Sequence, residues 1–140
     1  MNEINNNLTE KGYGLLCLPI ITDDRGSLSF AEWSNLPFEP MRVFWIFDIQ
    51  EGKTRGGHAH RSCAEIVYAV SGSFDIFIDN GKEQTTIHVG NPNEGIYIGR
   101  NVWCELRNFS PNTVCVALAS APYDMNGYIN NYNEFKEIQR

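Results

Sequence analysis

The sequence has no long hydrophobic run and no excess of basic residues. No stretch approaches the roughly 18 consecutive apolar residues that cross a bilayer, so we expect no membrane partner. The formal net charge is -6 at pH 7, whereas proteins that bind nucleic acid usually present a basic face. We therefore expect no nucleic acid polymer as a partner. An anionic small molecule stays possible, because it needs only a few well-placed arginines.

The sequence also lacks a CxxC pair and an export signal. The opening residues, MNEINNNLTEKG, are polar and do not have the basic-then-apolar pattern of a signal peptide. The four cysteines are spread over positions 17, 63, 104 and 115. An even number allows two disulfides, but without an export signal we expect reduced thiols in the cytoplasm. We expect residues 1–12 to be loosely ordered.

The length and composition are those of one folded unit. The chain has 140 residues, of which 42% are hydrophobic and 12% aromatic. This is enough for one domain with a substantial core and too short for two ordinary domains. We therefore expect a single domain over residues 1–140.

Short apolar, β-branched and aromatic runs, separated by turn residues, dominate the sequence. They predict strands at residues 15–20, 28–33, 42–49, 66–70, 73–79, 83–89, 94–98, 102–107 and 114–119. Only residues 126–138 are typical of a helix. So many short strands in a chain of this length indicate an all-β fold, a sandwich or a closed barrel, with a short C-terminal helix.

The clearest local prediction is a hairpin in the middle of the chain. Phe74, Ile76 and Ile78 are expected on one face of a strand. Asn80-Gly81 separates this run from the next one, at residues 83–89. An Asn-Gly pair between two such runs predicts a type I′ turn.

Two histidines stand one residue apart in the segment GKTRGGHAHRSCAEIVYAVSG, residues 52–72. Side chains at positions i and i+2 of a strand point to the same face, so His58 and His60 are expected to project together. Imidazoles suit proton transfer near neutral pH or the binding of a metal. We expect the chemistry of the protein at this segment.

The spacing G-x5-H-x-H-x4-E-x6-G in the same segment resembles the first sequence motif of the cupins. The second cupin motif has H-x3-N, for which this chain has Cys104 and Asn108. Cupins are small jelly-roll barrels, so the resemblance implies a cupin jelly-roll barrel with a short C-terminal helix.

A narrower resemblance extends over residues 15–138, which is nearly the whole chain. The segments that carry it are DRGSL (24–28), RV (42–43), RGGHAH (55–60), GIYIG (95–99), VW (102–103) and YINNYNEF (128–135). They are similar to the sugar 3,4-ketoisomerases of the WxcM-like cupin group. Those enzymes convert dTDP-4-keto-6-deoxyglucose to a 3-keto sugar, a step toward amino sugars of bacterial surface polysaccharides. The resemblance implies an isomerase that needs no metal or other cofactor, and a homodimer whose subunits exchange an N-terminal strand.

The resemblance also implies roles for individual residues. His58 and His60 match the two catalytic histidines of the family. We expect His58 to take the proton from C3 of the sugar and His60 to relay protons through an enediol. The expected substrate-binding residues are Arg25, Arg42, Arg55, Glu65, Tyr97 and Trp103.

Several of these residues have a structural alternative. Arg55 suits a pyrophosphate, because a planar guanidinium matches its oxygens, but it can also be a surface arginine. Arg25 lies in an expected turn, in which Gly26 permits a positive φ. Tyr97 can contact the substrate or pack, and Trp103 can stack on thymine or belong to the core.

The role of Glu65 separates the remaining hypotheses. If it is buried beside the histidines, we expect it to raise their pKa and to favour imidazolium. It also completes a ligand spacing, so a metal-dependent cupin that uses His58, His60, Glu65 and Cys104 is one alternative. A non-catalytic module that binds sugar nucleotides is another.

Overall fold

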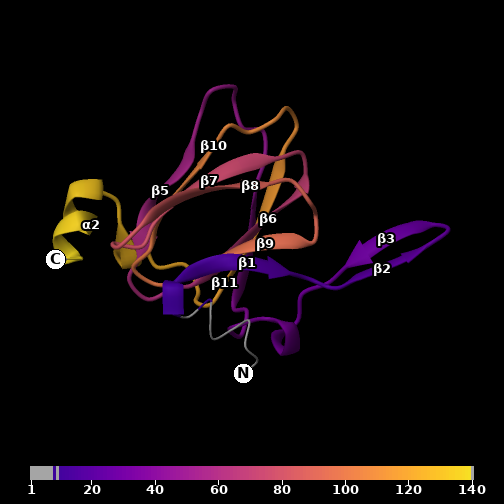
Figure 1. Cartoon of the computed structure of the whole chain (residues 1–140), viewed down its shortest axis with the longest axis horizontal. Helices are drawn as coiled ribbons and strands as arrows, with labels where there is room; N and C mark the ends of the chain where they lie inside the picture. The colour runs from indigo at the N-terminus through magenta and orange to yellow at the C-terminus, as the bar shows by residue number, and fades with distance from the viewer. Residues whose placement is uncertain (1–7, 9, 140) are drawn as a thin grey trace.

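Two antiparallel β-sheets that face each other form the body of the protein (Figure 1). The computed structural model describes residue 8 and residues 10–139. One five-stranded sheet has the order β1 (Tyr13–Cys17), β9 (Glu94–Ile98), β6 (Glu65–Ser71), β11 (Val114–Ala119) and β4 (Arg42–Ile46). The other has the order β12 (Tyr128–Ile129), β5 (Arg55–His60), β10 (Trp103–Arg107), β7 (Phe74–Asp79) and β8 (Gln84–Val89). With the short helix α2 (Tyr132–Ile138) at its C-terminal end, this is the all-β barrel that the sequence predicts.

The core lies between the sheets, because successive side chains of a strand point alternately inward and outward. Phe74, Ile76 and Ile78 of β7 are fully buried, which confirms the predicted alternation. They share one cluster with Val67 and Cys115 of the opposite sheet. The same alternation decides which polar side chains face the interior.

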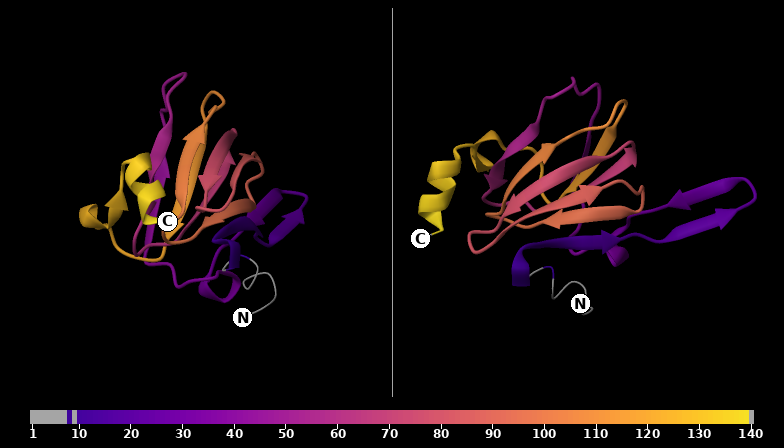
Figure 2. Two further views of the ribbon diagram at one scale, coloured as in Figure 1. Left: turned by 60° about the vertical axis from the view of Figure 1, so that its left-hand side comes forward. Right: turned by 45° about the horizontal axis from the view of Figure 1, so that its top comes forward.

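A hairpin of two strands, β2 (Ile20–Asp23) and β3 (Gly26–Ser29), projects from the body (Figures 1 and 2). Gly26 in its turn has φ 138°, as the sequence predicts. The strand expected over residues 28–33 is displaced, because pairing begins at the turn and ends at Ser29. Every residue of both strands is exposed.

The hairpin of β7 and β8 is confirmed, but the prediction of a type I′ turn is wrong. Asp79 pairs with Gln84, so residues 80–83 connect the strands. Asn80 fixes this longer loop, since its side-chain oxygen accepts the backbone N–H groups of Lys82 and Glu83, both at 2.9 Å. The Asn80 side chain thus provides the hydrogen bonds that a tight turn makes through its backbone, so the loop needs no positive φ at Asn80.

The C-terminal helix is shorter than the expected residues 126–138. A 3₁₀ helix at Met125–Gly127 and the strand β12 precede it. β12 pairs with β5, with Tyr128 opposite His60. α2 starts only after Asn131, whose side chain caps it by accepting the N–H of Glu134.

The segment expected to be loosely ordered lies partly outside the described residues, which do not include residues 1–7 and 9. Leu8 is 4% exposed and packs with Leu16 and Ile66. Gly12 donates its N–H to the Leu8 carbonyl oxygen at 2.8 Å. Leu8 and Gly12 are therefore held against the first sheet, whereas Glu10 and Lys11 are exposed. Among the residues that the structure describes, no helix is long and apolar enough to span a membrane.

Asp79 fastens α2 to the second sheet. It is only 1% exposed. Its carboxylate accepts hydrogen bonds from the Tyr132 hydroxyl and, at 3.3 Å, from Lys136 Nζ. It also accepts from the N–H of Gly81 at 2.8 Å and from Gln84 Nε2 at 3.3 Å. Burial raises the pKa of this carboxyl, but the hydrogen bonds outweigh burial and hold it below the ordinary value of 3.8.

We expect Asp79→Ala to destabilise the protein by about 2–3 kcal/mol, because it removes the buried acceptor of several hydrogen bonds. The free energy of unfolding in urea measures this loss. Asp24→Ala, in the exposed turn of the β2–β3 hairpin, is the control and should change it little. An Asp79→Ala protein as stable as the control would contradict a clamping role.

Candidate active site

A cavity of about 330 Å³ lies inside the barrel between the two sheets. Its polar and charged lining residues include Arg42, Arg55, His58, His60 and Glu65. The other lining residues are Phe44, Ile46, Gly56, Val67, Cys104, Leu106, Tyr123 and Tyr128. On β4, β5, β6 and β10 most of these residues are two apart, so the strand period turns them inward; Arg55, next to Gly56, is the exception. Five of the residues expected from the sequence to bind or transform a substrate thus share one cavity.

His58 and His60 face this cavity from β5. Their ring centroids are 4.7 Å apart, and the ring planes stand at 80° to each other. Just before them Gly56 has φ 80°, and a side chain there would approach the carbonyl oxygen of Cys104 to 3.1 Å. A glycine therefore lets β5 pass close to β10 at the point where the pairing register shifts.

Glu65 lies against His60, with Oε1 2.8 Å from Nε2. Both side chains are almost fully buried, at 5% and 6% exposed. The contact is too poorly aligned for a hydrogen bond, so Nε2 is a buried nitrogen without a hydrogen-bond partner among the described residues. A buried polar atom of this kind can bind a ligand that enters the cavity.

Burial lowers the pKa of His58 from 6.5 to about 4. The charge of His60 lowers it further, and Glu65 raises it by less. Glu65 acts on the pKa of His58 in the expected direction, but loss of hydration outweighs the carboxylate, so imidazolium is not favoured at His58. His58 is a neutral imidazole at pH 7.

Two arginines bring positive charge to the cavity. The Arg42 guanidinium lies between two aromatic rings, 5.1 Å from the centroid of Phe44 and 5.8 Å from that of Tyr123. Its Nε donates to the carbonyl oxygen of Ala121 at 3.3 Å. Arg42 is thus held in place, whereas Arg55 is exposed at the edge of the cavity.

The donor atoms of His58, His60 and Glu65 all lie within 4.8 Å of one another, so these residues can hold a metal ion. Two imidazoles and a carboxylate suit zinc or a similar divalent ion. Cys104 does not belong to this group. Burial, followed by the charges of Glu65 and Glu105, raises the pKa of its thiol far above the ordinary value, so the thiol is protonated while no metal is bound.

Three expected substrate-binding residues lie elsewhere in the chain. Trp103 is 4% exposed and packs in the core under α2 with Phe135. Tyr97 is half-buried against Phe38 on the outer side of the first sheet. Arg25 is exposed in the β2–β3 turn, where it forms an ion pair with Asp23.

Tyr128 and Tyr123 line the cavity, although the sequence did not single them out as site residues. Tyr128 reaches the histidines only because β12 pairs with β5. Tyr123 lies in the segment that leads into β12, so the same pairing brings it to the cavity. No local spacing signals a pairing between segments so far apart. The segment YINNYNEF, residues 128–135, contributed to the family resemblance, but that resemblance assigned no function to its tyrosines.

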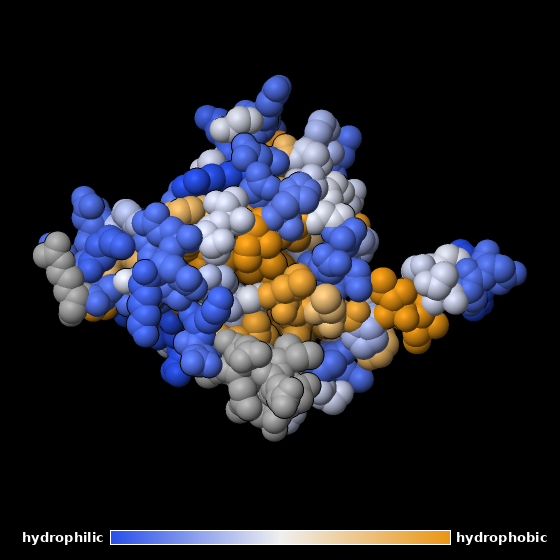
Figure 3. Space-filling view, viewed as in Figure 1, coloured by the Kyte–Doolittle hydropathy of each residue, from blue (hydrophilic) through white to orange (hydrophobic). Residues whose placement is uncertain are grey.

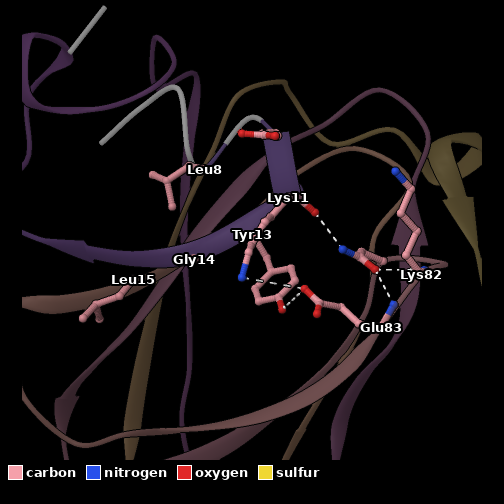
Figure 4. Close-up of a pocket in the computed structure, with 9 residues that line it drawn as sticks. Leu8, Lys11, Tyr13, Gly14, Leu15, Lys82 and Glu83 are labelled. Carbon is pink, nitrogen blue, oxygen red and sulfur yellow. Dashed lines mark hydrogen bonds and ion pairs between the residues drawn. The ribbon is translucent and has the colours of Figure 1, made fainter. Parts of the chain in front are cut away.

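A second, more open hollow of about 760 Å³ lies between the start of β1 and the β7–β8 turn (Figure 4). Its polar groups bind one another. The Tyr13 hydroxyl donates to Glu83 Oε1 at 2.7 Å, and Asn80 Nδ2 donates to the Lys11 carbonyl oxygen at 2.9 Å. These contacts join β1 to the hairpin of the other sheet, which is a structural role.

Comparison with known proteins places this geometry among sugar-nucleotide enzymes. A family model, FdtA, described as WxcM-like, C-terminal, matches residues 11–140. The chain is 38% identical over 118 residues to TDP-4-oxo-6-deoxy-alpha-D-glucose-3,4-oxoisomerase of Aneurinibacillus thermoaerophilus, which covers 84% of this chain and 85% of that protein. The solved structure of the WlaRB TDP-quinovose 3,4-ketoisomerase from Campylobacter jejuni is 41% identical, with a TM-score of 0.86 over 91% of this chain and 98% of that one. A histidine-to-asparagine mutant of the 3,4-ketoisomerase QdtA from Thermoanaerobacterium thermosaccharolyticum, solved with TDP-4-keto-6-deoxyglucose, is 30% identical. Its TM-score is 0.88, over 91% of this chain and 94% of that one.

The buried state of His58 predicts a specific loss of stability in acid. In the unfolded chain it takes up a proton near pH 6.5, but in the folded protein only near pH 4. Its contribution, about 3 kcal/mol, is therefore complete above pH 6.5 and is lost as the pH falls through 4. We expect His58→Gln to lose less stability than the wild type between pH 7 and about 4.5, as measured by urea unfolding.

His88→Gln is the control, because His88 is an exposed histidine on β8. It should retain the acid sensitivity of the wild type. An NMR titration that finds His58 half-protonated near pH 6.5 would contradict the prediction.

Proposed function

The chain belongs to the FdtA family of WxcM-like, C-terminal domains, and we propose from this premise that it is a sugar-nucleotide 3,4-ketoisomerase. It converts TDP-4-keto-6-deoxyglucose to a TDP-3-keto-6-deoxyhexose. The observation that carries the proposal is the group of His58, His60 and Glu65 at the bottom of a cavity that arginines border. Relatives that match over nearly the whole chain carry 3,4-ketoisomerase or 3,4-oxoisomerase activity in their names.

The reaction moves a carbonyl group between adjacent carbons by proton transfer alone. A base takes the proton from C3, the electrons of the broken C–H bond form a C3–C4 double bond, and the C4 oxygen takes up a proton. The hydroxyl on C3 then loses its proton and becomes the carbonyl, while C4 takes up a proton. One hydrogen leaves C3 and one arrives at C4, so the reaction consumes no oxidant or reductant.

His60 is the better base for the C3 proton, which reverses the order expected from the sequence. The Glu65 carboxylate, 2.8 Å away, stabilises the positive charge that His60 acquires when it takes a proton. His58 holds a proton poorly, because burial lowers its pKa to about 4. As a neutral imidazole it can donate one hydrogen and accept another, which suits a relay between the two sugar oxygens.

Arg42 and Arg55 supply the charge that a TDP-linked substrate needs. A guanidinium matches diphosphate oxygens in pairs. The arginines lie on β4 and β5, which belong to opposite sheets, and line the same cavity as the histidines. An overall charge of -6 therefore does not prevent the binding of an anion at this point.

The partner that we propose is a second copy of the chain, in an exchanged homodimer. Ile20, Ile21 and Leu28 of the projecting hairpin are 50–56% exposed, and Figure 3 shows apolar surface where the hairpin leaves the body. Val43 and Trp45 on β4 are 52% and 59% exposed. An isolated two-stranded hairpin is marginally stable in water, so packing against a partner supplies the missing burial.

Exchange of the hairpin also gives Arg25 a route to a substrate. In its own chain Arg25 is carried away from the cavity, at the tip of the hairpin. In an exchanged dimer the tip lies on the partner, where the expected contact of Arg25 with substrate can be made.

A metal-dependent cupin reaction is the second candidate, which the close grouping of His58, His60 and Glu65 favours. A divalent ion held there would act as a Lewis acid on the sugar oxygens. Its fit is incomplete, because the fourth cupin position is Cys104, which lies outside the group.

Incubation with TDP-4-keto-6-deoxyglucose in D2O, followed by NMR, tests the function. We expect a 3-keto product with deuterium at C4 and undiminished turnover after chelation. Loss of a stoichiometric ion together with activity would support the metal-dependent reaction instead. TDP binding without turnover would identify a non-catalytic module and overturn the proposal.

The two histidine variants separate the roles in the same assay. We expect His60→Asn to abolish exchange at C3 while it still binds TDP. His58→Asn should slow product formation but keep slow exchange of the C3 hydrogen, because the base is still present. The opposite pattern would restore His58 as the C3 base.

Sedimentation of the Ile21→Lys, Leu28→Lys double variant tests the dimer. Two charges in the proposed interface should convert a dimer to a monomer at micromolar concentration. His88→Lys, on the outer face of the second sheet, should remain dimeric. A wild-type protein that sediments as a monomer would rule out the exchanged dimer.

A further inference from the structure

We propose that Tyr128 is a positioning residue that holds the two catalytic imidazoles in place from the C-terminal segment. This inference rests on the proposed ketoisomerase function. It assigns a role to a residue of the last strand, β12. The proton transfers described above use no residue of β12 or α2.

The ring of Tyr128 contacts both histidines. Its centroid is 4.9 Å from that of His58, with the planes at 88°, and 4.5 Å from that of His60, with the planes at 53°. The edge of one ring against the face of another is a favourable aromatic geometry. The three rings therefore form one packed group, in which Tyr128 limits the rotation of both imidazoles.

The main chain fixes Tyr128 as well. It pairs with His60 in the antiparallel ladder of β12 and β5. Arg61 donates its backbone N–H to the carbonyl oxygen of Gly127 at 2.8 Å and its Nη1 to that of Tyr128 at 2.9 Å. The residue after Tyr128, Ile129, is 1% exposed in the core.

The helix α2 anchors the same segment from its far end. Phe135 is fully buried beside Trp103, and Tyr132 donates to the buried carboxylate of Asp79. Arg61 also pairs with Glu134 at 3.3 Å. The segment is thus attached on both sides of Tyr128, so its ring has a defined place over the histidines.

The variants Tyr128→Leu and Tyr128→Phe test the proposal. We expect Tyr128→Leu to lower kcat about 10- to 100-fold with a smaller change in KM, because the reacting groups lose their alignment. Tyr128→Phe should stay within about threefold of the wild type, since it keeps the ring. Among the described residues the hydroxyl makes no hydrogen bond that the variant would lose.

Histidine NMR supplies a readout that a purely structural role would not move. The chain has 3 histidines, so the imidazole signals of a 15N-histidine-labelled protein are few. In Tyr128→Leu we expect the ring signals of His58 and His60 to shift and broaden, because both imidazoles lose the ring that packs against them, while His88 keeps its signals. Tyr68→Leu removes a half-buried ring from the outer face of β6 and is the matched control for lost stability.

Arg61→Met provides a second test in case Tyr128→Leu does not fold. It removes the side-chain hydrogen bond to the Tyr128 carbonyl, so it should lower kcat and shift the His58 and His60 signals by less. Absence of turnover in the wild type would refute the ketoisomerase function itself. Normal wild-type turnover, with kcat and the imidazole signals unchanged in Tyr128→Leu, would refute only the positioning role. A Tyr128→Phe loss as large as that of Tyr128→Leu would also refute it, because the hydroxyl would then act on substrate.

Discussion

The whole molecule depends on the strict alternation of side chains along strands that face each other across one interior. Because every second residue points inward, the core and the site are built from the same strands. β7 fills the interior with Phe74, Ile76 and Ile78, whereas β5 fills its share with His58 and His60. A shift of β5 by one residue would turn both histidines to the outside. The packing that stabilises the barrel therefore also holds the chemistry in register.

The interior then imposes an electrostatic cost on the groups that it holds. Loss of hydration disfavours every charged form, and the two histidines meet this differently. His58 remains neutral, while His60 lies against the carboxylate of Glu65. Two chemically identical side chains on one face of one strand thus become unlike acid–base groups. The proposed reaction needs such a difference. One group must take the proton from C3, while the other moves a proton between the sugar oxygens.

Local patterns in the sequence could predict the centre of the site but not its walls. His58 and His60 lie on β5 and Glu65 on the next strand of the chain, β6, which belongs to the opposite sheet. Alternation turns all three inward, and the facing of the two sheets brings them together. Tyr128 depends on the pairing of β12 with β5, which no short motif encodes. Trp103 and Cys104 are consecutive residues of β10, so their side chains point to opposite faces. Cys104 lines the cavity, whereas Trp103 faces outward and is buried beneath α2. The relative basicity of the histidines depends on the extent of burial, which only the three-dimensional packing determines.

Glu65 shows why this interior is not optimised for stability alone. A carboxylate that is 5% exposed and whose contact with His60, among the described residues, leaves Nε2 without a hydrogen bond gains little from this pair. An apolar residue of similar size would fill the same place at a lower cost in hydration. The Asp79 carboxylate, by contrast, is equally buried but satisfied by several donors, and it holds the C-terminal helix in place. One buried carboxylate thus stabilises the fold, whereas the other leaves an incompletely satisfied pair facing the cavity. Such a pair is useful only when a ligand completes it, and this asymmetry is the strongest physical sign that the cavity is a site of reaction.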